Sequence, residues 1–253
     1  MQEGLVMDLY YDEILKIIGD IRKTERENIL KTARIVADQV KQDKLVYVFG
    51  PGGHSNLAAM EIFFRAGGLF HINAMINQET MISAGALKSM QVERLPGYGK
   101  IVVEDYNIGE GDLLWVVNAY GINSATIDAA LTAKERGAKV IGVSSIEHAT
   151  TCPLDHPARH PSKKNLHDVV DAHVDCKVKL GDAVLELPGL SQKIGALSTF
   201  ANAYIMNSVV IEAINMLVNE GVEPPIWRSG NCPGGDAWNN QFIDRFRGLV
   251  RCL

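Results

Sequence analysis

The chain has 253 residues, of which 47% are hydrophobic and 22% charged, so it can bury a large core and is not intrinsically disordered. Its net charge of -5 provides no basic surface for nucleic acid or anionic lipid, and we expect neither as a partner. No apolar run approaches the roughly 20 residues of a membrane span, and residues 1–14 are too acidic for a signal peptide, which predicts a cytoplasmic protein. The four cysteines form no C-x-x-C pair, which argues against a zinc ribbon or a thioredoxin-like centre.

The N-terminal part is predicted to begin with two helices within residues 7–42, because apolar residues recur there at helical spacing. A short β-branched run at 45–49 then ends in a glycine-rich loop, and helical spacing resumes over 56–65. The order is therefore strand, loop and helix. Further on we expect strands at 70–75 and 101–103 and a helix over 83–95.

A second copy of the strand, loop and helix pattern follows. Residues 113–117 are continuously apolar, Gly121 interrupts the run, and an amphipathic helix leads to Gly137 before another strand at 140–143. Continuous apolar runs between helices are typical of strands that are buried on both faces of a parallel sheet. The predicted fold class is α/β.

The C-terminal half begins with residues 147–168, a polar stretch with several prolines and histidines that is long enough to suggest an ordered functional loop. Beyond it we expect strands at 172–178 and 183–187, a long helix over 195–220, and a turn-rich tail from 224. No linker divides the chain, so we expect a single domain. It would comprise a helical extension (1–42), a core (43–220) and a tail (221–253).

Two loops that follow buried strands contain the candidate ligand-binding residues. The first has Gly52, Gly53, His54 and Ser55, and the second has Asn118, Tyr120, Asn123 and Ser124. Both lie where strand carboxyl ends meet helix N-termini, and the free N–H groups there favour an anion. The first loop lacks the third glycine of a dinucleotide-binding motif and the Gly-Lys-Ser/Thr of a P-loop. We expect the loops to share one anionic ligand, while tight turns and helix caps would use the same residue types.

The two loops and the segments after them resemble SIS (sugar isomerase) domain proteins. Other residues that carry the resemblance are Ala133 to Ile141, Gly181-Asp182-Ala183 and Glu223-Pro224-Pro225. The likeness covers residues 30–220 and is greatest to a group of SIS-domain proteins related to phosphoheptose isomerases. It implies a flavodoxin-like three-layer α/β/α sandwich, and a homodimer or homotetramer with its sites at the subunit interface.

The resemblance also implies catalytic residues. In SIS isomerases a glutamate on the helix after the first loop moves a proton between C1 and C2 through an enediol, and Glu61 fits that pattern. Arg65, four residues later, is a substrate-binding candidate. Opening a sugar ring needs a second acid–base group, for which His160 is the candidate and His54 the alternative.

Two features of the sequence bear on the charged group of the substrate. Arg159 and Lys163, near His160, form a basic cluster suited to an anion, or else a solvated charged run. Asn118 and Tyr120 occupy positions where SIS phosphate loops typically have serine or threonine. A sulfonate, with three acceptor oxygens and one charge, would tolerate these replacements, so a sulfosugar is the alternative to a sugar phosphate.

The predicted function is an aldose–ketose isomerase for an anionic sugar, most simply a sugar phosphate. It would use neither a metal nor an organic cofactor, since no histidine and carboxylate set has ligand spacing on a regular helix. A binding module that holds a sugar phosphate without turnover is the second hypothesis. A lyase or etherase that shares the enolisation step is the third.

Overall fold

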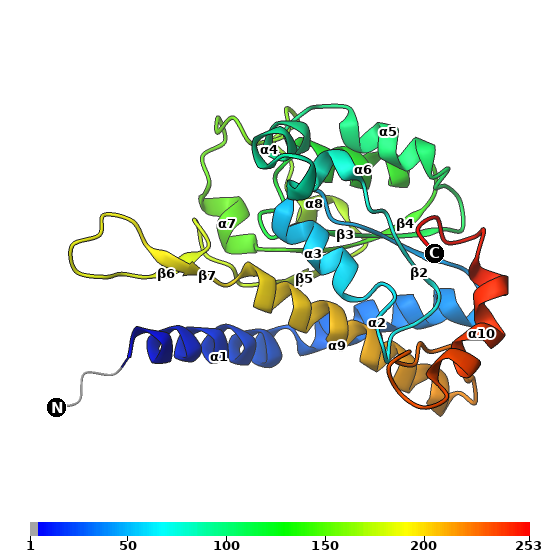
Figure 1. Cartoon of the computed structure of the whole chain (residues 1–253). Coiled ribbons are helices and arrows are strands. Elements are labelled where there is room, and N and C mark those ends of the chain that lie inside the picture. The colour runs from blue at the N-terminus through cyan, green and yellow to red at the C-terminus, as the bar shows by residue number, and fades with distance from the viewer. Residues whose placement is uncertain (1–4) are drawn as a thin grey trace.

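The computed structural model describes residues 5–253 and places a five-stranded parallel sheet between two layers of helices (Figure 1). The strand order is β2-β1-β3-β4-β5. The first half contains α1 (Val6–Thr24), α2 (Arg26–Lys41), β1 (Val46–Phe49), α3 (Gly53–Glu61), β2 (Ile72–Ala74), the 3₁₀ turns η1 (Gln78–Thr80) and η2 (Ile82–Ala84), α4 (Ala86–Glu93), α5 (Tyr98–Asp105) and β3 (Leu113–Val117). The second half contains α6 (Ser124–Glu135), β4 (Lys139–Ser144), α7 (Ile146–Thr151), α8 (Leu166–Val169), β5 (Ala172–Asp175), β6 (Ala183–Leu185), β7 (Ile194–Ala196), α9 (Ser198–Asn219) and α10 (Gly235–Phe246).

The central strand β3 shows why the sheet needs helices on both faces. All five of its residues are buried. Because successive side chains of a strand point to opposite faces, Trp115 packs in the core formed with α2, α3 and α9. Leu114 and Val116 pack in the core formed with α5, α6 and α8. The α/β class with a parallel sheet, predicted from continuous apolar runs, is confirmed.

The long helix α9 lies across one face of the sheet beside α2 and α3. Ala201, Ile205, Val209 and Ala213 are fully buried along it. Within residues 5–253 it is also the one helix whose length and mean hydropathy of 1.3 would suffice to cross a membrane. Its apolar composition follows from its place in the core, where 44% of that stretch is buried.

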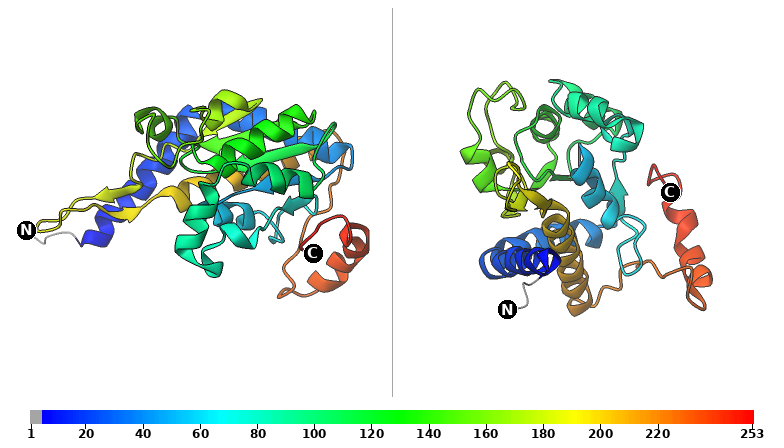
Figure 2. Two further views of the ribbon diagram at one scale, coloured as in Figure 1. Left: turned by 90° about the horizontal axis from the view of Figure 1, so that it is seen from above. Right: turned by 60° about the vertical axis from the view of Figure 1, so that its left-hand side comes forward.

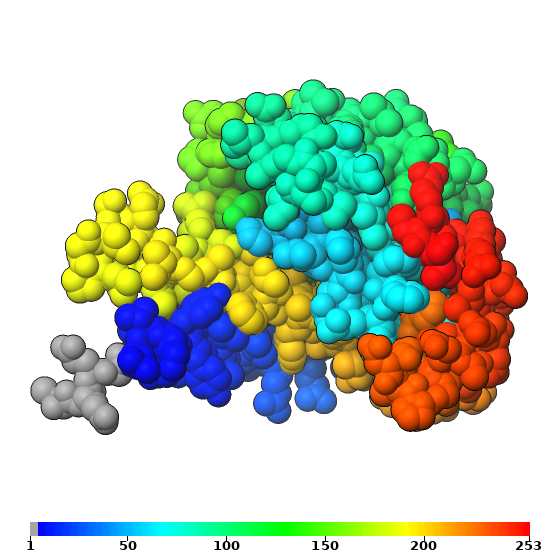
Figure 3. Space-filling model, viewed as in Figure 1, coloured from blue at the N-terminus to red at the C-terminus, as the bar shows by residue number. Residues whose placement is uncertain are grey.

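Helix α1 and the β6–β7 hairpin project together from one end of the molecule, and α10 lies at the other end (Figures 1 and 2). Tyr10 Oη donates to the carbonyl of Ala196 at 2.5 Å and so joins α1 to the hairpin. Asp182, just before β6, accepts from the backbone N–H groups of Leu197 and Ser198 at 2.9 and 2.8 Å. In the space-filling view the hairpin stands out from the body of the protein (Figure 3).

The C-terminal tail folds back on the β2 side of the molecule. Trp227 stacks on Phe70, with ring centroids 3.5 Å apart, and Phe246 of α10 joins the same buried cluster. The turn-rich composition of the tail did not predict helix α10. Aromatic side chains therefore hold a segment that has no apolar run of its own.

Several predicted elements differ from the structure. Residues 101–103 were expected to be a strand and are part of helix α5, because Val102 and Val103 are buried in a helix that packs against α6. The strand predicted at 183–187 exists as β6, but it pairs with β7 outside the main sheet. The long helix begins at Ser198 because residues 194–196 form β7, which was not expected.

Candidate functional site

The two glycine-containing loops meet at the carboxyl edge of the sheet. Phe49 and Val116 form the last pair between β1 and β3, so the chain leaves both strands at nearly the same level. Asn118 Nδ2 then donates to Pro51 O and to Ser55 Oγ, each at 3.2 Å. This cross-link joins the two loops that were expected to share one anionic ligand.

Asn118 is buried, and its amide is fully engaged within the protein. Its Oδ1 accepts from the backbone N–H groups of Tyr120 and Gly121 at 3.2 and 2.8 Å, while its Nδ2 binds the first loop. The side chain therefore shapes the second loop and fastens it to the first.

A hollow of about 280 Å³ opens between the two loops and helix α4. The lining includes Gly52, Gly53, His54 and Ser55 of the first loop, Asn118 and Tyr120 of the second, and Met90, Glu93 and Arg94 of the α4 segment. The N-terminus of α3 opens into it, since Gly52 is the N-cap residue and provides no side-chain cap. The backbone N–H groups of the first turn are consequently available to an anion.

Gly52 has a conformation and a position that only glycine allows. Its φ is 90°, and a Cβ atom placed on it would lie 1.9 Å from Oε2 of Glu93. The glycine thus leaves room for the Glu93 carboxyl against the backbone of the first loop.

Sequence reasoning did not find Glu93 or Arg94. Removal from water raises the pKa of Glu93 to about 7, against the lowering effect of neighbouring Arg94. The Arg94 Nε atom is buried and has no hydrogen-bond partner within residues 5–253. The helix predicted over 83–95 indicated that both residues are structured, but no local pattern indicated that this helix covers the first loop.

Tyr120 forms the wall of the hollow on the side of the second loop. Burial raises the pKa of its hydroxyl to about 12, with further contributions from the negative charges of Asp182 and Glu93. The ring stacks on His148 at a centroid distance of 4.2 Å. Burial, with the nearby Arg159 charge, lowers the pKa of that histidine to about 4. Tyr120 is therefore a protonated hydroxyl at neutral pH, held in place by a neutral imidazole.

Asn123 and Ser124 do not line the hollow, and both are buried. Asn123 Nδ2 donates to Ala158 O at 3.4 Å, and His160 N donates to Ile122 O at 2.8 Å, so the 156–160 segment closes over them. Asn123 Oδ1 and Ser124 Oγ are buried, and neither has a partner in the described part of the chain. These oxygens stand at the N-terminus of α6 with their hydrogen-bonding capacity unused.

The structure places the residues predicted from the 147–168 segment away from the hollow. His160 Nε2 lies 3.0 Å from Asp128 Oδ1, and its Nδ1 lies 2.6 Å from Ser162 Oγ. Arg159 is buried and donates to the carbonyls of Cys152 and Pro153 at 2.8 and 2.9 Å, as well as to Ala149 O and Asn165 Oδ1. Lys163 is exposed.

Glu61 and Arg65 lie beyond the hollow, at the far end of α3. The helix has nine residues and ends at Glu61, so about 12 Å of helix separates Glu61 from Gly53, where the helix begins. Glu61 Oε1 accepts from Asn207 Nδ2 of α9 at 3.2 Å and lies 3.2 Å from Arg65 Nη2. Arg65 itself follows the helix that was expected to include it.

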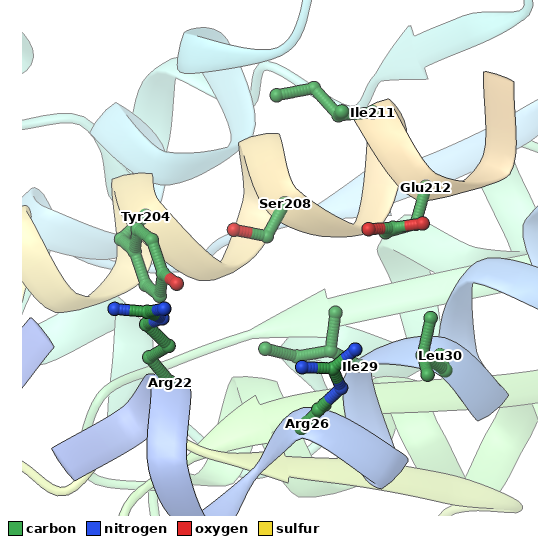
Figure 4. A pocket seen from close by; sticks show the side chains of 8 residues that line it. All are labelled: Arg22, Arg26, Ile29, Leu30, Tyr204, Ser208, Ile211 and Glu212. Atoms are coloured by element: carbon green, nitrogen blue, oxygen red, sulfur yellow. The ribbon is translucent and has the colours of Figure 1, made fainter. Parts of the chain in front are cut away.

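A second hollow, of about 240 Å³, lies between α9 and the junction of α1 with α2 (Figure 4). None of the site residues predicted from the sequence lines it. Tyr204 and Glu212 of α9 face Arg22 and Arg26 across it. This surface runs along the helical layer and is separate from the carboxyl edge of the sheet.

Comparison with known proteins identifies the family. A family model described as SIS domain matches residues 9–145. A UPF0309 protein of Caldanaerobacter subterraneus subsp. tengcongensis is 36% identical over 251 residues, which cover 98% of this chain and 100% of that relative. A UPF0309 protein of Halalkalibacterium halodurans is also 36% identical, over 96% of both chains.

Solved structures share the fold at low sequence identity. A phosphoheptose isomerase from Francisella tularensis gives a TM-score of 0.52 at 13% identity and covers 85% of this chain and 100% of its own. The Vibrio vulnificus NanR protein complexed with ManNAc-6P gives a TM-score of 0.50 at 15% identity and covers 99% of this chain and 72% of its own. By the family model and by relatives of similar length, the chain belongs to the SIS domain family.

Proposed function

We propose that the protein binds an anionic sugar, most simply a sugar phosphate, in the hollow over the first loop and interconverts its aldose and ketose forms. One observation carries the proposal. The open N-terminus of α3, the Arg94 guanidinium and the Glu93 carboxyl all border the same hollow. Such a site combines groups for an anion with a group for proton transfer.

The charged end of the sugar would lie against the first turn of α3. Backbone N–H groups of Gly53 and His54, the Ser55 hydroxyl and the Arg94 guanidinium are the donors at that end of the hollow. A phosphate and a sulfonate offer the same three acceptor oxygens and differ in charge. A sulfonated sugar therefore remains the alternative substrate.

For ring opening, the geometry favours His54 over His160 as the acid–base group. His54 is exposed on the first turn of α3 and lines the hollow, whereas His160 is hydrogen-bonded to Asp128 on α6. An imidazole can both donate and accept a proton, which suits it to opening a sugar ring.

The second candidate function is binding without turnover. It is favoured by the position of Glu61, the expected enediol base, outside the hollow. The similarity of the fold to a protein complexed with ManNAc-6P is consistent with it.

A ligand panel followed by exchange chemistry tests the proposal. Thermal unfolding is measured with ManNAc-6P, a heptose phosphate, hexose phosphates, sulfonated hexoses and the parent uncharged sugars at equal concentration, because a ligand of the native state raises stability by mass action. The stabilising sugar is then incubated in deuterated water and followed by NMR. Isomerisation with deuterium at the reacting carbon supports an isomerase, and stabilisation without exchange supports a binding module.

We also propose that two or more copies associate through the helical layer that contains α1 and α9. Leu9 and Leu15 of α1 and Ile211 of α9 are each at least half exposed. Exposed large apolar side chains on a helical layer can take part in an interaction surface. Light scattering coupled to size-exclusion chromatography measures the mass directly, and a monomer at micromolar concentration would contradict this assembly.

A further inference from the structure

We infer that Glu93, and not Glu61, is the group that moves the proton between the two sugar carbons. This inference rests on the proposed function and names the residue that performs its central step. It depends on where the two carboxyls lie, on what surrounds each, and on the chemistry that isomerisation requires.

The Glu93 carboxyl borders the hollow from the α4 side and lies against the first loop at Gly52. Its Oε2 is close enough to Gly52 that a Cβ there would overlap it. The N-terminal turn of α3, where the anionic end of a sugar would bind, lines the same cavity. A sugar of ordinary size held at that turn therefore extends past Glu93.

The surroundings of Glu93 suit proton transfer. Apolar Ile82, Ala86 and Met90 share the lining of the hollow with it. The charged and titratable groups that face the same cavity are Arg94, His54 and Tyr120. No second carboxylate lines that cavity within residues 5–253. Because removal from water brings the pKa of Glu93 to about 7, the carboxyl can both accept and release a proton near neutrality.

The chemical step balances without a co-reactant. The Glu93 carboxylate takes the proton from C2 of the open-chain aldose, and the electron pair of that C–H bond forms the C1–C2 double bond. The π pair of the C1=O1 bond moves to O1, which gains a proton from solvent. The resulting enediol loses the proton of its O2 hydroxyl to solvent, and the carboxylic acid returns its proton to C1. The product is the ketose, and Glu93 is again a carboxylate.

Glu61 has a different environment. It lies about 12 Å of helix away from Gly53, the first residue of α3, and beside Arg65 and Asn207. The hydrogen bond from the Asn207 amide holds this carboxylate against α9, and the ion pair with Arg65 is a second contact. Its contacts indicate a role in fixing the packing of α3 on α9.

The test compares Glu93→Gln, Glu61→Gln and wild type, with Glu104→Gln on exposed α5 as the control for the substitution itself. Each variant is assayed with the sugar phosphate that stabilises the wild type. Three quantities are measured: the ligand-induced shift in unfolding temperature, the rate of deuterium exchange at C2, and the pH dependence of kcat/KM.

We expect Glu93→Gln to keep its ligand-induced shift and to lose about 10²- to 10⁴-fold in exchange rate, the usual contribution of a positioned acid–base group. Wild-type kcat/KM should rise with pH through about 7, because the base must be ionised. That inflection should be absent from the residual activity of Glu93→Gln. Retention of binding distinguishes a lost chemical step from a protein that fails to fold.

Other outcomes overturn the inference in different ways. If Glu61→Gln loses exchange while Glu93→Gln keeps it, Glu61 is the base and only the assignment of Glu93 fails. If the wild type binds sugar phosphates but exchanges no proton with any of them, the isomerase function and the role of Glu93 fail together. If Glu93→Gln loses both binding and exchange, the same two measurements are made on Glu93→Asp. The inference then fails unless Asp restores binding together with measurable exchange.

Discussion

The hollow over the first loop and the 147–168 segment contain similar side chains in contrasting environments. Arg159 uses its guanidinium to bind three main-chain carbonyls and Asn165, whereas the Nε of Arg94 is buried without a partner in the described part of the chain. His160 is held by Asp128, whereas His54 lies exposed on a helix N-terminus. Arg159 and His160 are thus engaged within the fold, whereas Arg94 and His54 line the hollow, where a ligand can reach them.

Among the substitutions, the largest expected effect on stability comes from removing Arg159. Arg159→Ala would leave the carbonyls of Ala149, Cys152 and Pro153 without their donor, and unsatisfied buried groups cost about 1 to 3 kcal/mol each. We expect a loss of about 3 kcal/mol in the free energy of unfolding, measured by denaturant titration. Sugar-phosphate affinity of the folded fraction should be unchanged. Full stability with weakened ligand binding would place Arg159 in the site instead.

Acid pH should destabilise the protein through its buried histidines. Burial lowers the pKa of His173 to about 4 in the folded protein. In the unfolded chain the same imidazole is protonated below about pH 6.5. Stability should therefore fall as the pH drops from about 6.5 to 4, by about 1.4 kcal/mol per pH unit for each such histidine. His173→Asn should reduce this slope in thermal unfolding, and His156→Asn, on an exposed side chain, should not. Equal slopes in all three proteins would show that His173 does not carry the effect.

Removing Arg94 should affect the ligand and leave the fold intact. Arg94→Ala removes a guanidinium that lines the hollow, and a hydrogen bond to a charged group contributes about 2 kcal/mol, or roughly 30-fold in Kd. Calorimetric titration with the stabilising sugar phosphate measures the loss. Arg247→Ala, on an exposed side chain after α10, is the matched control. Unchanged affinity in Arg94→Ala would mean that the anion binds elsewhere.

Lys163 should give the smallest effect. Its side chain is exposed on the 147–168 segment, outside the hollow. For Lys163→Ala we expect changes below about 0.5 kcal/mol in both unfolding and ligand binding. A clear loss of affinity would instead show that this segment moves over the site when the ligand binds.

Much of the candidate site could be predicted because it depends on local sequence. Gly52 and Ser55 follow one apolar run and Asn118 follows another, and the carboxyl ends of parallel strands must lie at the same edge of a sheet. Glu61 was assigned from the resemblance to SIS isomerases, as the glutamate on the helix after the first loop. Helix α3 runs away from the hollow, so Glu61 at its end does not lie near the bound ligand that we propose.

The sequence by itself determined the alternation of buried strands and helices, the α/β class and the meeting of the two loops, because hydrophobic periodicity and glycine positions act over a few residues. Only the tertiary structure decided that α4 covers the first loop, that Arg159 faces inward and that residues 101–103 are helical. Each of these depends on which distant segments a side chain meets after folding. Burial and hydrogen bonding with those segments outweigh the weak local preferences of short stretches.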